Sequence, residues 1–318
     1  MNVGKRARAN AMLTVASAIW GFAFVAQRVG AQVVGPMTFN SVRFAMAAAA
    51  VGGLVAFLDH RRGLSRERRR AATRRALVPG LICGSLLALA GGLQQAGMTG
   101  PSGTTAGSAA FITGLYMVLV PLAGLFFGRR IGWRIVVGVV CAVCGLYLIC
   151  VTDGLTIGWG NLLVLASAFA WTGHILCIDH YSKRTSALRL AAVQFVGCSL
   201  VSAIAAPVVD PAPFAGIWEA IVPLLYGGLL AGGVAFTLQV VAQRDAHPTH
   251  ASLIMALEAV FGALGGALLL SENMGLRGYF GAALMVAGVV VSQLGRRPGD
   301  RRRGSYAAAP PTQAADGR

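Results

Sequence analysis

The sequence predicts an all-α integral membrane protein with ten transmembrane helices, arranged as two inverted five-helix repeats. The chain of 318 residues is 56% hydrophobic and 12% charged, whereas soluble domains carry about 25% charged residues. Neutral stretches of about 18 to 27 residues recur along it, and each can cross a hydrocarbon core roughly 30 Å thick. Short signatures in the first half also recur, at the same spacing, in the second half.

Short segments in which the basic residues cluster separate the ten neutral stretches. The predicted spans in chain order are 11–29, 37–58, 76–97, 101–127, 133–152, 158–179, 187–207, 218–241, 248–270 and 276–294. The first span follows a basic lead-in, as a signal peptide does, but its match to the span around Trp171 indicates that it is retained. The chain therefore divides into an N-terminal segment (1–10), a first repeat (11–152), a second repeat (153–295) and a basic tail (296–318) with a composition typical of disorder.

The repeat is visible in two pairs of signatures. Trp20 is followed 23 residues later by the centre of Val42-Arg43-Phe44, and Trp171 is followed 23 residues later by the centre of Val193-Gln194-Phe195. The second pair matches Ala109–Ile112 and Leu115-Tyr116 with Ala251–Ile254 and Leu257-Glu258. An odd number of spans per copy inverts the second copy relative to the first. Because inverted repeats are the usual construction of secondary transporters, transport is the leading functional hypothesis.

The basic residues predict the orientation in the membrane. Of the 27 lysines and arginines, 24 fall in segments on one side: the N-terminus, the connections after the second, fourth, sixth and eighth spans, and the tail. The positive-inside rule then places both termini in the cytoplasm, in a multi-pass protein of the cytoplasmic (inner) membrane with anionic lipids beside its basic loops. The net charge of +16 does not indicate nucleic-acid binding, since no aromatic residues are interleaved with the basic runs.

Glu258 is the strongest candidate for chemistry, because it lies ten residues into the ninth span. An acid near the bilayer midplane costs roughly 2.5–3.5 kcal/mol and must face the bundle interior or a wet cavity. There it is a candidate proton carrier or a site for a cationic substrate. The alternative is a protonated acid that hydrogen-bonds between helices. Its counterpart Tyr116 offers a hydroxyl at a similar depth.

Arg43 complements this acid, about six residues into the second span and so roughly 10 Å deep at 1.5 Å per residue. Its guanidinium could bind a substrate carboxylate or phosphate. Alternatively it pairs with an acid or caps helix carbonyls. Its counterpart Gln194 keeps a hydrogen-bonding group but has no charge, so anion recognition would differ between the repeats.

Three further side chains are candidates for the same cavity. Trp20 and Trp171 fall near the middle of their spans, away from the interfaces where tryptophan is usually enriched, and could stack on a flat or cationic substrate. Helix packing is the alternative. His174 follows Trp171 by one helical turn and shares its face, where it could relay protons or hold a structural hydrogen bond.

The sequence contains no motif for a disulfide, a metal site, a phosphate-binding loop or a catalytic centre. The six cysteines, of which Cys141 and Cys144 are three residues apart, all fall within predicted spans. Without a second pair or a nearby histidine they predict packing, with no disulfide or metal site. We find no phosphate-binding loop, paired carboxylates or nucleophile with a base at fixed spacing, so we expect no cofactor.

On these residues the chain resembles the EamA-type transporters of the drug/metabolite transporter superfamily, over about 11–294. The motifs that carry the resemblance are Trp20-Gly21, Val42-Arg43-Phe44, Ala251–Ile254, Leu257–Phe261 and Ser271-Glu272. The resemblance implies a ten-helix fold with a central substrate cavity, in proteins that often export amino acids or other metabolites across the bacterial inner membrane. The first repeat departs from the pattern, with Arg129-Arg130 where the family tends toward Gly-Glu and Tyr116 in place of an acid.

We therefore expect a secondary transporter, in the export direction, of a small polar or amphipathic metabolite that works by alternating access. Glu258, Arg43, Trp20, Trp171 and Tyr116 would line its cavity, together with His174 and Gln194. Protons are a possible partner, through a gradient, and substrate exchange or uncoupled transport are the alternatives. An integral-membrane lipid-modifying enzyme would need catalytic groups near one interface, which the sequence lacks. A non-transporting scaffold would lack a central cavity.

Overall fold

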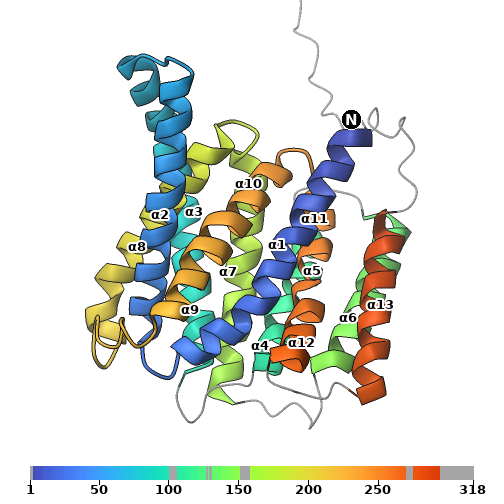
Figure 1. Ribbon diagram of the computed structural model, residues 1–318. Coiled ribbons are helices and arrows are strands. Elements are labelled where there is room, and N and C mark those ends of the chain that lie inside the picture. The colour runs from blue at the N-terminus through green and yellow to red at the C-terminus, as the bar shows by residue number, and fades with distance from the viewer. Residues whose placement is uncertain are drawn as a thin grey trace, which may run out of the picture.

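The computed structural model describes residues 3–99, 106–126, 128, 131–150, 158–269 and 275–293, and these are helical, with no strand among them (Figure 1). The helices are α1 (Val3–Gly30), α2 (Pro36–Arg61), α3 (Arg66–Gly97), α4 (Ala106–Gly114), α5 (Tyr116–Phe126), α6 (Trp133–Cys150), α7 (Trp159–Tyr181), α8 (Ala187–Val209), α9 (Ile221–Leu225), η1 (Tyr226–Phe236), α10 (Thr237–Gln243), α11 (Pro248–Met255), α12 (Glu258–Leu269) and α13 (Gly275–Gln293). The basic tail predicted for 296–318 lies outside the described residues.

The predicted fold class is confirmed. Seven continuous helical segments are long and apolar enough to cross a membrane. The fourth, eighth and ninth predicted spans are each built from shorter helices in series: α4 with α5, α9 with η1 and α10, and α11 with α12. The first and third spans are longer than predicted, since α1 begins at Val3 and α3 at Arg66, within the basic segments. The chain is therefore a multi-pass membrane protein.

The packing of the helices has the symmetry expected of two inverted repeats. The second helices of the two repeats, α2 and α8, pack against each other, as do the last helices, α6 and α13. Other contacts occur in equivalent pairs: α3 packs on α7, as η1 packs on α1. The N-terminus, the α2–α3 hairpin and the α7–α8 and α10–α11 connections lie at one end of the bundle (Figure 1). This is the end that the basic residues predict to be cytoplasmic.

Two helices are interrupted at equivalent positions of the repeats. The break between α4 and α5 falls at Leu115, and the break between α11 and α12 falls at Ala256 and Leu257. Short i→i−3 hydrogen bonds replace helical ones there: Leu115 N donates to Ile112 O at 3.2 Å, and Leu257 N donates to Ile254 O at 3.1 Å. Discontinuous helices are typical of the substrate sites of transporters. The breaks place Tyr116 and Glu258 at the first positions of α5 and α12.

The eighth span contains an 11-residue π-helix, η1. Its glycines allow close contact with α2: a Cβ on Gly228 would lie 2.8 Å from the carbonyl oxygen of Arg43 and 2.9 Å from Cβ of Met46. The π-helix is rare and occurs mostly as single turns at functional sites. We therefore attribute the unusual 11-residue length of η1 to its close packing against neighbouring helices.

The antiparallel helices α2 and α8 are held together at both ends. At one end, the carboxylate of Asp210 after α8 accepts hydrogen bonds from the backbone N–H groups of Met37 (3.0 Å) and Thr38 (2.7 Å), and so caps the start of α2. At the other end, Arg189 at the start of α8 donates to both carboxylate oxygens of Asp59 near the end of α2, at 2.6 and 2.7 Å. These contacts link one repeat to the other.

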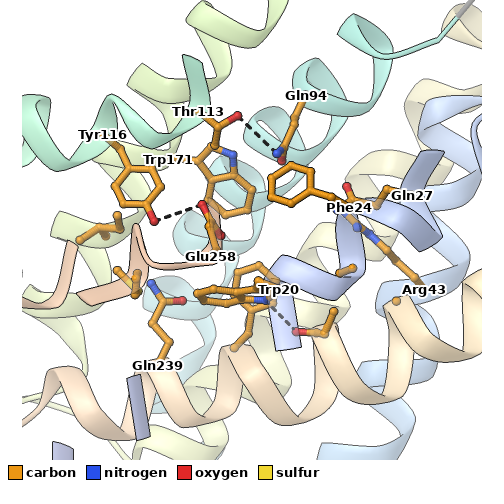
Figure 2. A pocket seen from close by; sticks show the side chains of 16 residues that line it. Trp20, Phe24, Gln27, Arg43, Gln94, Thr113, Tyr116, Trp171, Gln239 and Glu258 are labelled. Atoms are coloured by element: carbon orange, nitrogen blue, oxygen red, sulfur yellow. Dashed lines mark hydrogen bonds between the residues drawn. The ribbon is translucent and has the colours of Figure 1, made fainter. Parts of the chain in front are cut away.

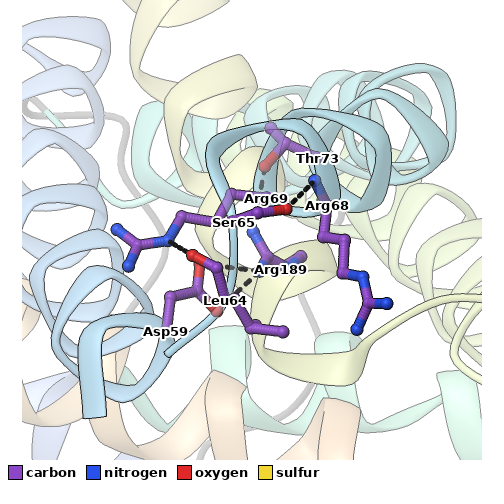
Figure 3. A network of polar contacts seen from close by, with 7 residues as sticks. All are labelled: Asp59, Leu64, Ser65, Arg68, Arg69, Thr73 and Arg189. Carbon is purple, nitrogen blue, oxygen red and sulfur yellow. Dashed lines mark hydrogen bonds and ion pairs between the residues drawn. The ribbon is translucent and has the colours of Figure 1, made fainter. Parts of the chain in front are cut away.

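The contacts around Arg189 extend into the α2–α3 hairpin (Figure 3). Arg189 also donates to the Thr73 hydroxyl at 3.0 Å, and Arg69 donates to the carbonyl oxygen of Leu64 at 2.8 Å. The Ser65 hydroxyl caps α3 by accepting from the backbone N–H of Arg68 at 3.3 Å. Arg189 and Asp59 are buried, and they join the end of α2 and the start of α8 to the more exposed residues of the hairpin.

We expect Arg189→Ala to lower the free energy of unfolding by about 3–5 kcal/mol, because it leaves the buried Asp59 carboxylate without its cation. Arg70→Ala is the matched control, since Arg70 is an exposed arginine of the same hairpin without an ion pair among the described residues, and surface substitutions usually change stability by less than about 0.5 kcal/mol. Unfolding of the purified variants in detergent measures both losses. Equal losses would show that the Asp59–Arg189 pair does not hold the repeats together.

Candidate functional site

A central cavity of about 60 Å³ lies between the two repeats (Figure 2). Helices α1 to α5 of the first repeat and α7, η1, α10, α11 and α12 of the second contribute to it. Its lining residues are Trp20, Ala23, Phe24, Gln27, Arg43, Gln94, Thr113, Tyr116, Trp171, Ile175, Gly227, Ala231, Phe236, Gln239, Met255 and Glu258. The structure therefore brings five of the seven predicted site residues to one cavity: Glu258, Arg43, Trp20, Trp171 and Tyr116.

Tyr116 and Glu258 meet across the two helix breaks. The Tyr116 hydroxyl donates a hydrogen bond to Oε1 of Glu258 at 3.2 Å, and both side chains are buried. Among the described residues no lysine or arginine forms an ion pair with Glu258. Glu258 also begins α12, where the partial positive charge of a helix N-terminus favours a carboxylate. The repeat counterparts thus form one polar pair in the cavity wall.

Close contact between α1 and α12 sets the position of this pair. A Cβ on Gly21 would lie 2.5 Å from Cβ of Phe261 and 2.7 Å from the carbonyl oxygen of Glu258. Only glycine allows the two backbones to approach so closely. Trp20, the neighbour of Gly21, and Glu258 both line the cavity.

Arg43 is buried without a carboxylate partner in the described part of the chain. Its Nε and Nη2 donate to Oδ1 of Asn40 at 3.0 and 2.7 Å. Asn40 is in turn held by its own amide, which donates to the Ser202 hydroxyl at 3.1 Å. The guanidinium also lies over the rings of Phe39 and Phe44, at 5.4 and 4.8 Å. A neutral amide thus orients the cation and leaves its charge uncompensated.

A glycine of α3 makes room for the pair of Asn40 and Arg43. A Cβ on Gly91 would lie 2.9 Å from Oδ1 of Asn40 and 3.0 Å from Nη2 of Arg43. Of the alternatives to substrate binding left open by the sequence, neither pairing of Arg43 with an internal acid nor capping of helix carbonyls is seen among the described residues, since its side-chain hydrogen bonds go to Asn40. Binding of a substrate anion stays a prediction.

Aromatic side chains form the wall between these polar groups. Figure 2 shows Arg43 on one side of the cavity, Tyr116 and Glu258 on the other, and Trp20, Phe24 and Trp171 around the space between them. The Trp20 ring lies 4.7 Å from the Phe236 ring, and the Trp171 ring stacks on Phe236 at 5.9 Å.

Trp20 is fixed by the π-helix. Its indole N–H donates to the carbonyl oxygen of Ala231 in η1 at 3.1 Å. The tryptophans that mark the repeat are therefore cavity residues, and both also pack against the two largest hydrophobic clusters of the bundle.

His174 and Gln194 do not belong to the cavity lining, contrary to our expectation. They are fully buried and contact each other, with His174 Nε2 and Gln194 Oε1 3.1 Å apart. His174 lies edge-on to Trp171, with ring centroids 5.8 Å apart. One helical turn does place His174 beside Trp171, and its ring contacts Gln194 of α8 and lies edge-on to Phe236 of the cavity wall, with ring centroids 6.0 Å apart.

Four polar cavity residues were not among the predicted site residues: Gln27, Gln94, Thr113 and Gln239. Gln94 donates to the Thr113 hydroxyl at 3.4 Å, in line with the interhelical hydrogen bond expected of a glutamine inside a span. Gln27 Oε1, Gln239 Oε1 and Trp171 Nε1 have no hydrogen-bond partner among the described residues. Such buried polar groups cost about 1–3 kcal/mol each unless water or a ligand satisfies them.

Membrane-spanning helices in two inverted repeats, with interrupted helices that meet at a central cavity, are the construction of a multi-pass membrane transporter. The sequence profile of the EamA-like transporter family matches the chain twice, at residues 7–151 and 158–293, and the chain belongs to this family.

Similar proteins agree with this assignment. An uncharacterized transporter of Archaeoglobus fulgidus is 30% identical over 91% of this chain and 87% of its own length. The uncharacterized transporter YoaV of Bacillus subtilis is 22% identical over 86% of this chain and 92% of its own length. A protein solved by crystallography shares the fold with a TM-score of 0.68, at 18% identity over 90% of this chain and 98% of that chain.

Proposed function

We propose that the protein is a secondary transporter that exports a small amphipathic zwitterion, such as an amino acid, across the cytoplasmic membrane by alternating access. The observation that carries the proposal is the buried Arg43 cation, which faces the cavity without a carboxylate partner among the described residues. A charge in an apolar setting is stable only when it is paired. The Asn40 amide accepts hydrogen bonds from the Arg43 guanidinium but does not neutralise its positive charge. A substrate carboxylate supplies the negative charge that is missing.

The other groups of the cavity fit the rest of such a molecule. Arginine presents a rigid fork that matches a carboxylate. The hydroxyl of Tyr116 and the carboxyl of Glu258 lie on the opposite side and can accept the hydrogens of an ammonium group. The aromatic wall between them accommodates an apolar side chain. This arrangement favours a zwitterion with an apolar side chain over a simple anion.

The cavity is also small for such a substrate. Its volume of about 60 Å³ is below the roughly 300–1,000 Å³ typical of ligand sites, so the helices around it must separate to admit a metabolite. The segments suited to such movement are the α4–α5 and α11–α12 breaks and the π-helix η1, all of which contribute to the lining. The α2–α8 pair, held at both ends, would move as one body.

A binding screen tests the proposed substrate class. Purified protein is heated in detergent with each of the L-amino acids and, in parallel, with the corresponding amino acid amides, which lack the carboxylate. We expect at least one apolar amino acid to raise the melting temperature, since a ligand that binds only the native state stabilises it, and its amide to have no effect. Amides that stabilise as well as the acids would contradict recognition by Arg43.

A further inference from the structure

A second, larger hollow lies at the end of the bundle where α1 begins. It measures about 490 Å³ and lies between the first turns of α1 and the end of α10, beside the turn after α7. These ends are neighbours at the side of the bundle that carries the N-terminus (Figure 1). The charge distribution predicts that this side is cytoplasmic, level with the lipid headgroups.

The rim of this hollow is cationic. Lys5, Arg8 and Arg244 line it, are exposed, and have no ion pair or hydrogen bond among the described residues. Lys183 also lines it but forms an ion pair with Asp179. Asp245 is the acid in the lining. Three uncompensated cations against one carboxylate leave the rim with a net positive charge.

The floor of the hollow is apolar. Ala9 and Met12 of α1 and Val241 and Ala242 of α10 are its apolar lining residues. Ala9 and Ala242 are buried, whereas Met12 and Val241 are half-buried and leave apolar surface open. An apolar floor beneath a cationic rim at the membrane surface matches a molecule that joins a phosphate to an acyl chain. A soluble phosphate would use the rim alone.

We propose that this hollow binds the headgroup of an anionic phospholipid, with the phosphodiester between Lys5, Arg8 and Arg244 and the acyl chain along the groove between α1 and α10. Because α1 belongs to the first repeat and α10 to the second, the bound lipid joins the two repeats at this end. Both helices also line the central cavity, through Trp20 and Gln239. The lipid is therefore positioned to favour one arrangement of the two repeats, and the site does not depend on which substrate is carried.

Thermal unfolding of delipidated protein in a nonionic detergent tests the proposal. Phosphatidylglycerol, phosphatidylcholine with the same acyl chains, and sodium glycerol 3-phosphate are titrated separately. We expect phosphatidylglycerol to raise the melting temperature at a concentration at least about tenfold below that needed for phosphatidylcholine. Equal effects of the two lipids would overturn the proposal. Stabilisation by glycerol 3-phosphate as strong as that by phosphatidylglycerol would also overturn it, in favour of a site for soluble phosphate esters.

Two matched variants locate the effect. Lys5→Gln/Arg8→Gln/Arg244→Gln removes the cations of the rim and should abolish the preference for phosphatidylglycerol. Arg66→Gln/Arg70→Gln/Arg74→Gln removes the same charge from exposed positions of α3 and should retain it. If the control variant loses the preference as completely, the lipid responds to net charge and not to this hollow. Should the rim variant prove too unstable to purify, the single reversal Arg8→Glu is expected to weaken the preference in the same way.

Discussion

Arg43→Gln is expected to weaken the binding of a carboxylate-bearing substrate by about 30-fold or more. Removal of one partner from a buried, hydrogen-bonded charge pair costs about 2–5 kcal/mol, and each 1.4 kcal/mol is about a factor of ten in Kd. Binding of the amino acid that stabilises the wild type is measured by titration with detection of tryptophan fluorescence, since Trp20 and Trp171 line the cavity. An unchanged Kd would remove Arg43 from the binding site.

Asn40→Asp tests whether the uncompensated charge of Arg43 is needed for binding. It leaves the arginine in place and adds a carboxylate beside it. The substitution keeps the size of the side chain and places a carboxylate where Asn40 Oδ1 now accepts from Nε and Nη2 at 3.0 and 2.7 Å. The Ser202 hydroxyl, now an acceptor at 3.1 Å, can turn and donate to the new carboxylate. We expect binding of the amino acid to fall at least about tenfold while the protein remains folded, because an internal ion pair now competes with the substrate.

The control for Asn40→Asp is Ser202→Ala, which removes a hydrogen bond from Asn40 without adding a charge. It should lower stability by about 0.5–1.5 kcal/mol and leave the Kd nearly unchanged. If Asn40→Asp binds the amino acid as well as the wild type does, the uncompensated charge of Arg43 is not what recognises the substrate.

Glu258→Gln is expected to abolish the coupling of transport to a pH gradient while transport continues at lower substrate affinity, since the amide oxygen still accepts from an ammonium group but carries no charge. The amide keeps the size of the side chain and can still bond Tyr116, but it cannot carry a proton. In wild-type proteoliposomes, exchange of one proton for one substrate would concentrate the substrate up to about tenfold on the acidic side for each unit of pH difference. In Glu258→Gln the substrate should only equilibrate.

Tyr116→Phe is the control for this experiment, because it removes the hydrogen bond to Glu258 (3.2 Å in the wild type) but keeps the carboxyl group. We expect it to retain accumulation on the acidic side. A gradient response of Glu258→Gln equal to that of the wild type would assign the proton to another group, or show that transport in both proteins is coupled in another way.

The fold could be predicted because a lipid environment leaves the chain few choices. Backbone groups in hydrocarbon must be satisfied within their own segment, so long neutral stretches become helices. The matched positions of Trp20 and Trp171, and of Tyr116 and Glu258, then identified the repeat. The bounds of α7, α8 and α13 differ from the predicted spans by at most a few residues.

The helix breaks could not be predicted in the same way. Leu115 and the pair Ala256 and Leu257 lie in apolar sequence with no proline or glycine at the break between α11 and α12, and their helical preference is high. Tertiary contacts therefore decide where α11 stops, whereas α4 ends at Gly114, a residue of low helical preference. The π-helix η1 is likewise set by packing against α1 and α2.

The contact between Asn40 and Arg43, unlike the helix breaks, could have been predicted from the sequence. It precedes Arg43 by three residues, and side chains at this spacing meet on one helix face. The spacing does not determine whether the partner of Arg43 is this amide or an acid from another helix. The prediction that His174 lines the cavity met the complementary limit. Its spacing from Trp171 predicts its helix face but not which neighbouring helix that face contacts.

Counterflow in proteoliposomes tests most directly whether the central cavity carries a zwitterion between the two sides of the membrane. Liposomes loaded with an unlabelled mixture of L-amino acids are diluted into each radiolabelled amino acid in turn, with wild-type protein and with Arg43→Gln. We predict transient accumulation of at least one apolar amino acid by the wild type and none by Arg43→Gln. No accumulation of any amino acid by the wild type, or equal accumulation by both proteins, would contradict this function for the cavity.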